Sequence, residues 1–217
     1  MQNKKLSNGT LAAIIVLGII VADQFLKIWV KTSFCLGESL TFTNWAELYF
    51  IENPGMAFGI ELGGKLFLSI FRIIASIALV YFLFKIRKSE AYPKGFIVCL
   101  SMITAGAIGN VIDCMFYGLI FSESTPFTLA TLFPDGGGYG TFLHGMVVDM
   151  LHFPLIEGTW PDWVPGVGGT DFEFFRPVFN IADAAISVGI VVLIFGYSKY
   201  LSFSAKSEDE KPEESKQ

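Results

Sequence analysis

Charged residues are scarce in this chain of 217 residues: aspartate, glutamate, lysine and arginine make up 16% of it, while 53% of the residues are hydrophobic. A mean hydropathy of +0.56 is too high for an ordinary soluble domain. The chain also lacks a surplus of basic residues, because its formal net charge is −5, which argues against a nucleic-acid partner. The composition therefore predicts a membrane protein.

Cysteine and histidine are few as well. Three cysteines make no disulfide framework, although a Cys35–Cys114 bond stays open beside the alternative of small buried thiols. The two histidines, His144 and His152, flank Asp149 at spacings of five and three, and these spacings match no standard zinc motif. We therefore expect no metal and no other cofactor, with a zinc site at these three residues as the rival interpretation.

Four apolar stretches are long enough to cross about 30 Å of hydrocarbon at about 1.5 Å per residue. They cover residues 11–30, 66–84, 96–113 and 180–201. The first follows Lys4 and Lys5, but it is long, contains Lys27 and precedes no small-residue cleavage site, so we predict a retained span. The expected fold is an all-α membrane bundle of four transmembrane helices.

Basic residues gather on one side of this predicted bundle. The link between the second and third spans contains Lys85, Arg87, Lys88 and Lys94, whereas residues 114–179 contain one basic residue against seven acidic ones. The positive-inside rule then places both termini in the cytoplasm and residues 31–65 and 114–179 outside. We expect one integral membrane domain over residues 1–202 and a disordered cytoplasmic tail at residues 203–217.

The two external segments differ in composition. Residues 31–65 are rich in threonine and aromatic residues with partial alternation, which predicts short strands in a small β-containing cap outside the membrane. Residues 114–179 are rich in glycine, proline and aromatic residues. We interpret them as an extended external loop or small cap on the outer surface of the membrane, with tryptophan and tyrosine at the headgroup level.

Seven charged or amide side chains within the spans fall in the outer half of the membrane. Asp23 and Lys27 share one helix face, and so do Asn110 and Asp113. A charge at the bilayer centre costs about 2.5–3.5 kcal/mol, so convergence from four helices predicts a polar site that opens outward. The inner half has no equivalent, which argues against a channel or transporter. The seven are Asp23, Lys27, Arg72, Asn110, Asp113, Asn180 and Asp183.

Most of these residues also have a purely structural interpretation. Asp23 and Lys27 can form an intrahelical ion pair without chemistry, Asn180 is expected to cap its helix, and Arg72 is expected to extend to the lipid headgroups. Asp183 differs because no basic residue lies three or four positions away from it. It therefore needs a partner from elsewhere in the chain.

Five sequence blocks follow one another at the predicted outer face: "DQFLK", "ENPGMAFG", "GAIGNVID", "GMVVDM" and "FNIADAAI". In this order, and over residues 20–190, they resemble the lipoprotein signal peptidases, or type II signal peptidases. The resemblance implies an aspartyl protease of the bacterial cytoplasmic (inner) membrane. Its substrate would be a diacylglyceryl-modified prolipoprotein, cut just before the lipidated cysteine. The other expected partner is membrane phospholipid, and a monomer would suffice.

The resemblance assigns the catalytic dyad to Asp149 and Asp183. Two carboxylates that share a site titrate apart, so one can act as base while the other acts as acid. It also implies that nine further residues bind substrate or organise the site, with the small Ala184 leaving room for a bulky substrate. They are Asp23, Lys27, Asn53, Gly106, Gly109, Asn110, Asp113, Asn180 and Ala184.

Two features depart from the family pattern. Cys114 stands where the family usually has an arginine, and Arg72 and Arg176 are the candidate replacements. The segment between Asp113 and Asp149 is longer than the family pattern predicts, and we interpret the extra residues as an extended lid. The alternative from another class is a small non-enzymatic membrane carrier or assembly factor with a polar pocket in the outer leaflet.

Overall fold

Four long helices dominate the computed structural model, which describes residues 6–54, 65–174 and 176–201. They are α1 (Asn8–Ser33), α2 (Lys65–Ile86), α3 (Lys94–Ile112) and α5 (Ile181–Leu201). All four apolar segments are long and hydrophobic enough to cross a membrane, as predicted. The predicted disordered tail and the "GMAFG" part of the second block lie outside the described residues.

The third apolar segment extends beyond the predicted end at residue 113. After α3 the chain continues through a π-helical turn, η1 (Asp113–Tyr117), into the short α4 (Gly118–Ile120). The residues after Asp113, "CMFYGLI", are apolar and contain no proline, so the segment continues to Ile120. Such π-helical turns often occur at functional sites.

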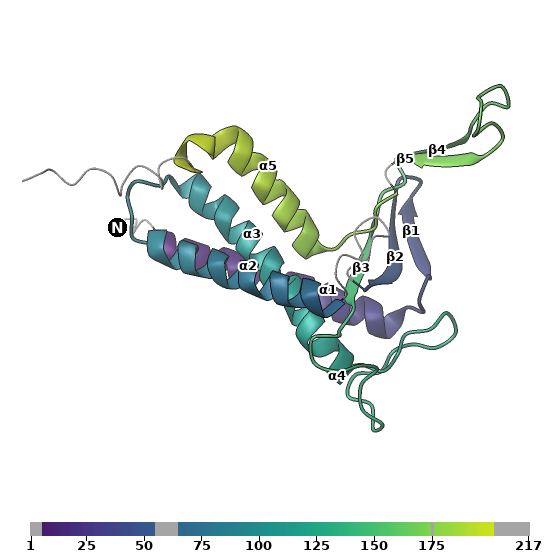
Figure 1. The fold of residues 1–217 in the computed structure, drawn as a ribbon, viewed down its shortest axis with the longest axis horizontal. Helices are drawn as coiled ribbons and strands as arrows, with labels where there is room; N and C mark the ends of the chain where they lie inside the picture. The colour runs from purple at the N-terminus through teal and green to yellow at the C-terminus, as the bar shows by residue number, and fades with distance from the viewer. Residues whose placement is uncertain (1–5, 55–64, 175, 202–217) are drawn as a thin grey trace, which may run out of the picture.

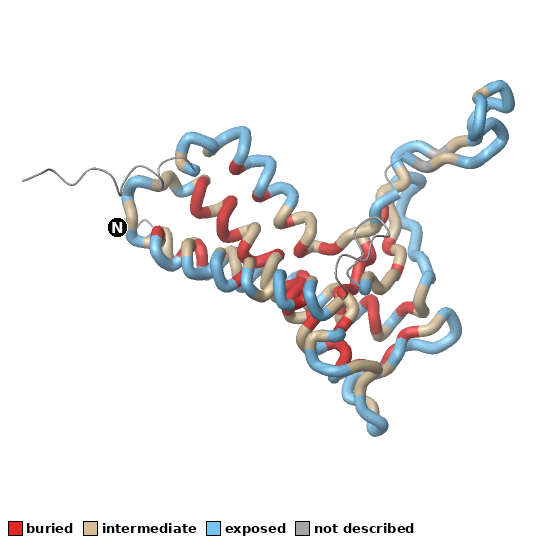
Figure 2. The backbone as a smooth tube through the Cα atoms, in the orientation of Figure 1, coloured by how far each residue is buried: buried red, intermediate tan, exposed pale blue. Residues whose placement is uncertain are grey.

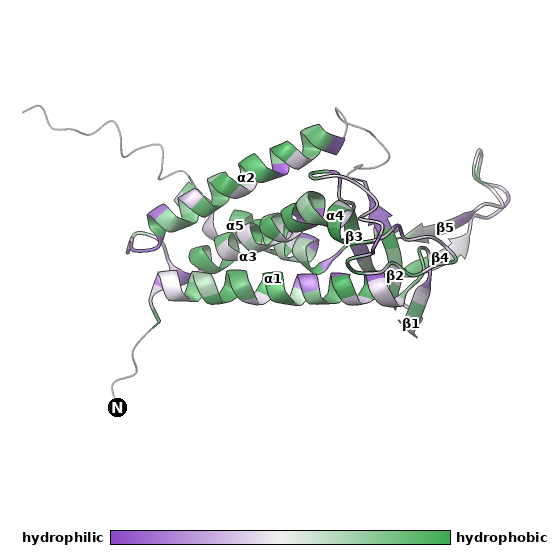
Figure 3. Cartoon of the chain, turned by 90° about the horizontal axis from the view of Figure 1, so that it is seen from below, coloured by the Kyte–Doolittle hydropathy of each residue, from purple (hydrophilic) through white to green (hydrophobic). Residues whose placement is uncertain are grey.

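α3 is the central helix of the bundle, because α1, α2 and α5 all pack against it. Buried residues concentrate on α3, whereas the outer faces of the other three helices are exposed (Figure 2). Figure 3 shows that hydrophobic residues run along all four helices. The exposed ones include Phe25, Phe67 and Phe195, which are 73%, 61% and 86% exposed. Apolar side chains that face outward are typical of contact with lipid.

Two small sheets lie beyond one end of the bundle (Figure 1). The strands β1 (Ser39–Thr43), β2 (Ala46–Asn53) and β3 (Val147–His152) form an antiparallel sheet in the order β1-β2-β3, which pairs Ile51 with Asp149. A separate hairpin consists of β4 (Ile156–Thr159) and β5 (Asp171–Phe174). The short strands predicted within residues 31–65 are confirmed, and three more strands occur in residues 114–179.

Phe179 connects the three-stranded sheet to α5. Its N–H donates to the main-chain oxygen of Leu151 at 3.0 Å, and its oxygen accepts from the Leu151 N–H at 2.7 Å. This bridge holds the chain that enters α5 against β3, so Asp149 of β3 lies near the first turn of α5. Below the sheet, an apolar cluster joins it to α1 and η1; its buried members include Val30, Phe50, Tyr117, Val148 and Met150.

The long loop between α4 and β3 folds back on the helix that precedes it. The Tyr139 N–H donates to the oxygen of Phe121 at 2.9 Å, and the Leu36 N–H donates to the oxygen of Thr125 at 3.0 Å. These bonds hold the loop to the end of α4 and to the turn after α1. Its interpretation as a lid stays a prediction.

Candidate active site

Lys27 joins α1 to the end of α3 at the centre of a buried ionic cluster. Its ammonium lies 2.9 Å from Asp23 Oδ2 and 2.8 Å from Asp113 Oδ2, and it donates to Asn110 Oδ1 at 2.9 Å. The side chains of the three charged residues are at most 1% exposed. Asp23 and Lys27 therefore form the predicted intrahelical pair, but Lys27 also links two helices. Such burial is tolerated where charges are paired and their hydrogen bonds are satisfied.

Gln24 completes this cluster, although the sequence analysis did not single it out. Its Nε2 donates to Asp113 Oδ1 at 2.8 Å and to the Gly109 oxygen at 3.2 Å, and its Oε1 accepts from the Tyr117 hydroxyl at 3.1 Å. The feature of the sequence that could have indicated this role is a glutamine next to Asp23 inside an apolar stretch. Its role depends on partners more than 80 residues away along the chain.

Asp149 and Asp183 lie at the two ends of a bridge made by two side-chain amides. Asn180 Nδ2 donates to Asp149 Oδ1 at 2.7 Å, and Asn110 Nδ2 donates to Asp183 Oδ1 at 2.7 Å. The amides meet each other, because Asn180 Nδ2 lies 3.2 Å from Asn110 Oδ1. The structure thus brings together a strand residue and a helix residue that are 34 positions apart.

The orientation of both amides is fixed by their other bonds. The Oδ1 atom of Asn180 accepts from the Asp183 N–H at 2.8 Å, which confirms the predicted cap of α5. The Oδ1 atom of Asn110 accepts from the Lys27 ammonium at 2.9 Å. Because each oxygen faces a donor, each NH₂ group must face a carboxylate. The ionic cluster therefore orients Asn110, and the first turn of α5 orients Asn180.

The two carboxyl groups have different surroundings. Asp149 is 2% exposed, whereas Asp183 is partly exposed. Burial, and then the negative charge of Asp183, raise the pKa of Asp149 to about 7, although hydrogen bonds from Asn180 and Asn53 oppose this rise. At neutral pH, Asp149 therefore keeps its proton in about half of the molecules, whereas an ordinary aspartate has lost it.

Gly106 and Gly109 permit close contact between α3 and α5. A methyl group at Gly106 would overlap the main-chain oxygen of Ala182, and one at Gly109 would lie 2.9 Å from Asp23 Oδ2. The Ala182 N–H itself donates to Asp23 Oδ1 at 2.9 Å. These glycines thus make room for helix packing and for a site carboxylate. Ala184, one turn into α5, is partly exposed.

Arg72 contacts the π-helical turn that follows α3, and its extension to the lipid headgroups stays a prediction. Its Nη1 donates to Cys114 Sγ at 3.1 Å, because the sulfur of Cys114 in η1 faces α2 and offers an acceptor. Arg72 therefore touches the residue that stands where the family usually has arginine. Cys35, Cys99 and Cys114 are all free thiols, so the Cys35–Cys114 disulfide is absent.

A second buried ion pair was not anticipated. Lys31, one turn after Lys27, pairs with Glu52 of β2 and donates to Ser124 Oγ at 2.8 Å. Its ammonium also lies 5.0 Å from the ring centre of Tyr139. This contact ties together α1, β2 and the long loop. The four-residue spacing from Lys27 was the signal that could have revealed it.

The two histidines contact residues other than Asp149 and Asp183. His144 Nδ1 lies 2.9 Å from Thr141 Oγ1, and His152 Nδ1 lies 2.8 Å from Glu47 Oε1. Within the described part of the chain, no three histidine, cysteine, aspartate or glutamate side chains are grouped so as to hold a metal ion. The zinc interpretation therefore gains no support from these residues.

The fold and the site define a membrane protein whose helical bundle carries a paired-carboxylate site at one end. Residues 15–199 match the family described as signal peptidase (SPase) II. The chain belongs to this family, the lipoprotein signal peptidases, and is therefore a membrane protease. This membership favours the enzyme over the non-enzymatic carrier.

Individual relatives agree with this membership. A lipoprotein signal peptidase from Porphyromonas gingivalis is 49% identical, over 96% of this chain and 92% of the relative. One from Amoebophilus asiaticus is 37% identical, over 81% of this chain and 72% of the relative. A solved structure of a bacterial membrane enzyme at 2.3 Å resolution has a TM-score of 0.58 and 25% identity, and covers 93% of this chain and 94% of that one.

Proposed function

We propose that the protein is an aspartyl endopeptidase with Asp149 and Asp183 as its catalytic dyad. It removes the signal peptide from diacylglyceryl-modified prolipoproteins, just before the lipidated cysteine. The observation that carries the proposal is the pair of amide contacts that hold both carboxyl groups to one bridge, Asn180 to Asp149 and Asn110 to Asp183. The relatives called lipoprotein signal peptidases support the substrate class.

The different surroundings of the two aspartates suggest their roles. Asp183, partly exposed, acts as the base that takes a proton from water while the water oxygen attacks the scissile carbonyl carbon. Asp149, whose pKa is raised to about 7, starts protonated and gives its proton to the carbonyl oxygen. When the tetrahedral intermediate collapses, the C–N bond breaks and Asp183 returns its proton to the leaving nitrogen. Asp149 takes back a hydroxyl proton as the C=O bond reforms, so both aspartates return to their starting states.

The remaining site residues act on this pair through position. Lys27 holds the Asn110 oxygen, and Asn110 in turn donates to Asp183. Asn53, at the end of β2, hydrogen-bonds the Asp149 side chain. Asp23 and Asp113 supply the negative charge that keeps the Lys27 ammonium in place. Ala184 leaves space for the lipidated cysteine beside the dyad.

The proposed setting is the bacterial inner membrane, with both termini in the cytoplasm and the dyad at the outer, periplasmic face. The basic link between α2 and α3 supports this orientation. The two sheets then form a periplasmic cap, and residues 1–202 act as one membrane domain. A monomer suffices, because α1, α3, η1, α5, β2 and β3 of one chain supply every member of the site.

Cleavage of a purified diacylglyceryl-modified prolipoprotein in detergent tests the dyad. We expect Asp149→Asn and Asp183→Asn each to lower the rate by about 10²–10⁴-fold, because each removes a proton-transfer group. Asp135→Asn is the matched control: it alters an exposed carboxylate of the long loop and should cleave like the wild type. Wild-type cleavage by either dyad variant would overturn the assignment.

A further inference from the structure

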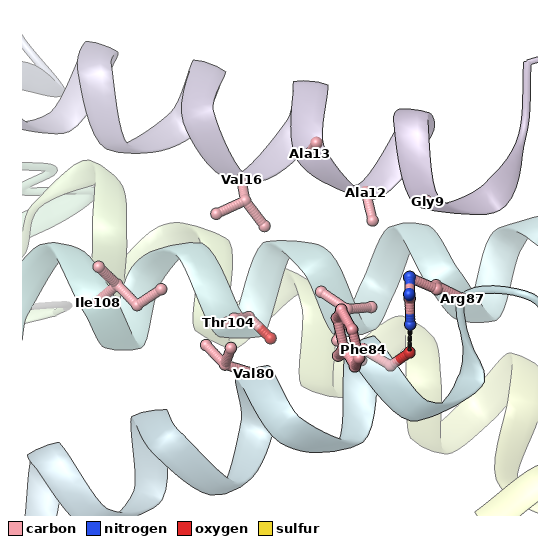
Figure 4. Close-up of a pocket in the computed structure, with 10 residues that line it drawn as sticks. Gly9, Ala12, Ala13, Val16, Val80, Phe84, Arg87, Thr104 and Ile108 are labelled. Atoms are coloured by element: carbon pink, nitrogen blue, oxygen red, sulfur yellow. Dashed lines mark hydrogen bonds between the residues drawn. The ribbon is translucent and has the colours of Figure 1, made fainter.

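An apolar groove lies between α1 and α2 at the end of the bundle away from the dyad (Figure 4). It has a volume of about 290 Å³, and its lining includes Ala12, Val16, Val80, Leu83, Thr104 and Ile108. Figure 4 shows that Val16 of α1 and Val80 of α2 face Thr104 and Ile108 of α3 across this space. α1 and α2 both pack mainly on α3, which leaves the groove between them.

Basic side chains lie at the mouth of the groove. Gly9 and Arg87 line both the groove and a second hollow of about 460 Å³, which is lined mainly by polar and charged residues, so the two spaces adjoin. The hollow adds Lys88 and Lys94 against a single acidic residue, Glu90. Three cations and one anion leave an excess of positive charge at this mouth.

Arg87 is held at the junction of the groove and the hollow. Its guanidinium lies 3.4 Å from the ring centre of Phe84 and donates to the Phe84 oxygen at 2.6 Å. Its side chain passes close to Gly9, where an added methyl group would lie 3.6 Å from the Arg87 Cδ. The arginine thus presents a charge where the apolar lining ends.

We propose that the groove and hollow together bind one anionic phospholipid, with an acyl chain in the groove and the phosphate against Arg87, Lys88 and Lys94. The lining matches a molecule that is apolar along one part and anionic at its end, and the groove lies between helices that contact lipid. Basic pockets between transmembrane helices on the cytoplasmic side are known to bind acidic lipid headgroups. Only the choice of the inner leaflet depends on the orientation proposed above.

The bound lipid fills the space between α1 and α2 and contacts both helices. It should therefore stabilise the bundle without contact with the dyad. This lipid site is distinct from the substrate site, because its residues come from the first turns of α1, the last turns of α2 and the middle of α3. If the proposed peptidase activity were not found, lipid binding could still be measured. If lipid binding were not found, the peptidase assay could still be carried out.

Native mass spectrometry of the full chain, with added phosphatidylglycerol or phosphatidylcholine, tests the proposal. We expect one phosphatidylglycerol to be retained in preference to phosphatidylcholine. Arg87→Gln should weaken phosphatidylglycerol binding roughly fivefold, the effect of one basic residue near a lipid surface. Lys199→Gln, an exposed basic residue at the same end of the bundle, should bind like the wild type.

A second variant tests the groove independently of charge. Val80→Trp fills the groove and should reduce binding of both lipids, whereas Ile77→Trp, 64% exposed on the same helix and outside the groove lining, should not. Thermal unfolding in phosphatidylglycerol nanodiscs should show a higher midpoint for the wild type than for Val80→Trp. Equal binding of the two lipids, or wild-type binding by Arg87→Gln or by Val80→Trp, would overturn the proposal.

Discussion

At the scale of single residues, Asp149 sets the expected pH dependence of catalysis. Burial and the charge of Asp183 raise its pKa to about 7, so the acid form is lost as the pH rises through this value. We therefore expect kcat/KM to fall about tenfold per pH unit above about 7, since the proton donor disappears. A pH profile of cleavage between pH 5 and 9 measures this. An unchanged rate up to pH 9 would contradict the assignment of Asp149 as the acid.

Folding stability supplies the control for this assignment. Because the pKa of Asp149 is higher in the folded state, the folded protein holds its proton where the unfolded chain has released it. The free energy of unfolding therefore contains a stabilising contribution from Asp149 that is fully present below the unfolded pKa of about 3.9. This contribution is lost as the pH rises through the folded pKa of about 7. Asp149→Asn removes this dependence, so the variant should unfold at a higher temperature than the wild type at pH 8. Equal unfolding temperatures would show that burial of the ionised Asp149 side chain does not lower the stability of the fold.

At the scale of elements, the contact between α3 and α5 determines where Asn180 and Asp183 lie. Gly106→Ala places a methyl group against the Ala182 main chain, which cannot yield as a side chain would. We expect a loss of about 1–3 kcal/mol in stability and a lower cleavage rate, because α5 must shift away from Asn110. Thermal unfolding and the cleavage assay together measure both effects.

The matched control for that variant is Gly18→Ala on α1. Gly18 is exposed and has nothing within 4 Å of an added methyl group, so the change should be neutral or slightly stabilising. If Gly106→Ala behaved like Gly18→Ala in both assays, close approach of α3 and α5 would not be needed for the site.

At the scale of the whole molecule, the thiols offer a test of orientation. Cys35 is partly exposed just beyond α1, at the end of the bundle that carries the sheets, whereas Cys99 and Cys114 are buried. In spheroplasts, a membrane-impermeant maleimide should label Cys35 of the wild type. Glu90→Cys in a Cys35→Ser background should be labelled only after permeabilisation, because residue 90 lies in the opposite, basic link. The reverse pattern would invert the proposed topology.

The sequence predicted four helices that are long and apolar enough to cross a membrane, although the third segment continues past Asp113 to Ile120. This prediction is possible because hydropathy over about 20 residues is a local property. The sequence also predicted the common depth of Asp23, Lys27, Asn110, Asp113 and Asp183. Each lies near the same end of its span. Because a charge in hydrocarbon is costly, five polar residues at one end of the bundle indicate one shared polar site. The order of the five blocks identified the family, which the comparisons confirmed.

Side-chain partners were decided by the tertiary structure alone. Nothing in the local pattern of Gln24 or Lys31 shows that they reach Asp113 and Glu52, and the direction of Arg72 depends on the sulfur of a neighbouring helix. Asp149 lies in no apolar span, so only the resemblance linked it to Asp183. Its place is fixed by the pairing of β3 with β2 and by the Phe179 bridge.

The physical reason for this division is the range over which each feature acts. Insertion into a membrane depends on the summed transfer free energy of consecutive residues, so the sequence by itself determined the number of spans and their polar ends. The amide bridge between Asp149 and Asp183 joins four residues that are up to 73 positions apart. Such contacts form only after the helices pack, so the tertiary structure alone decided which polar groups meet.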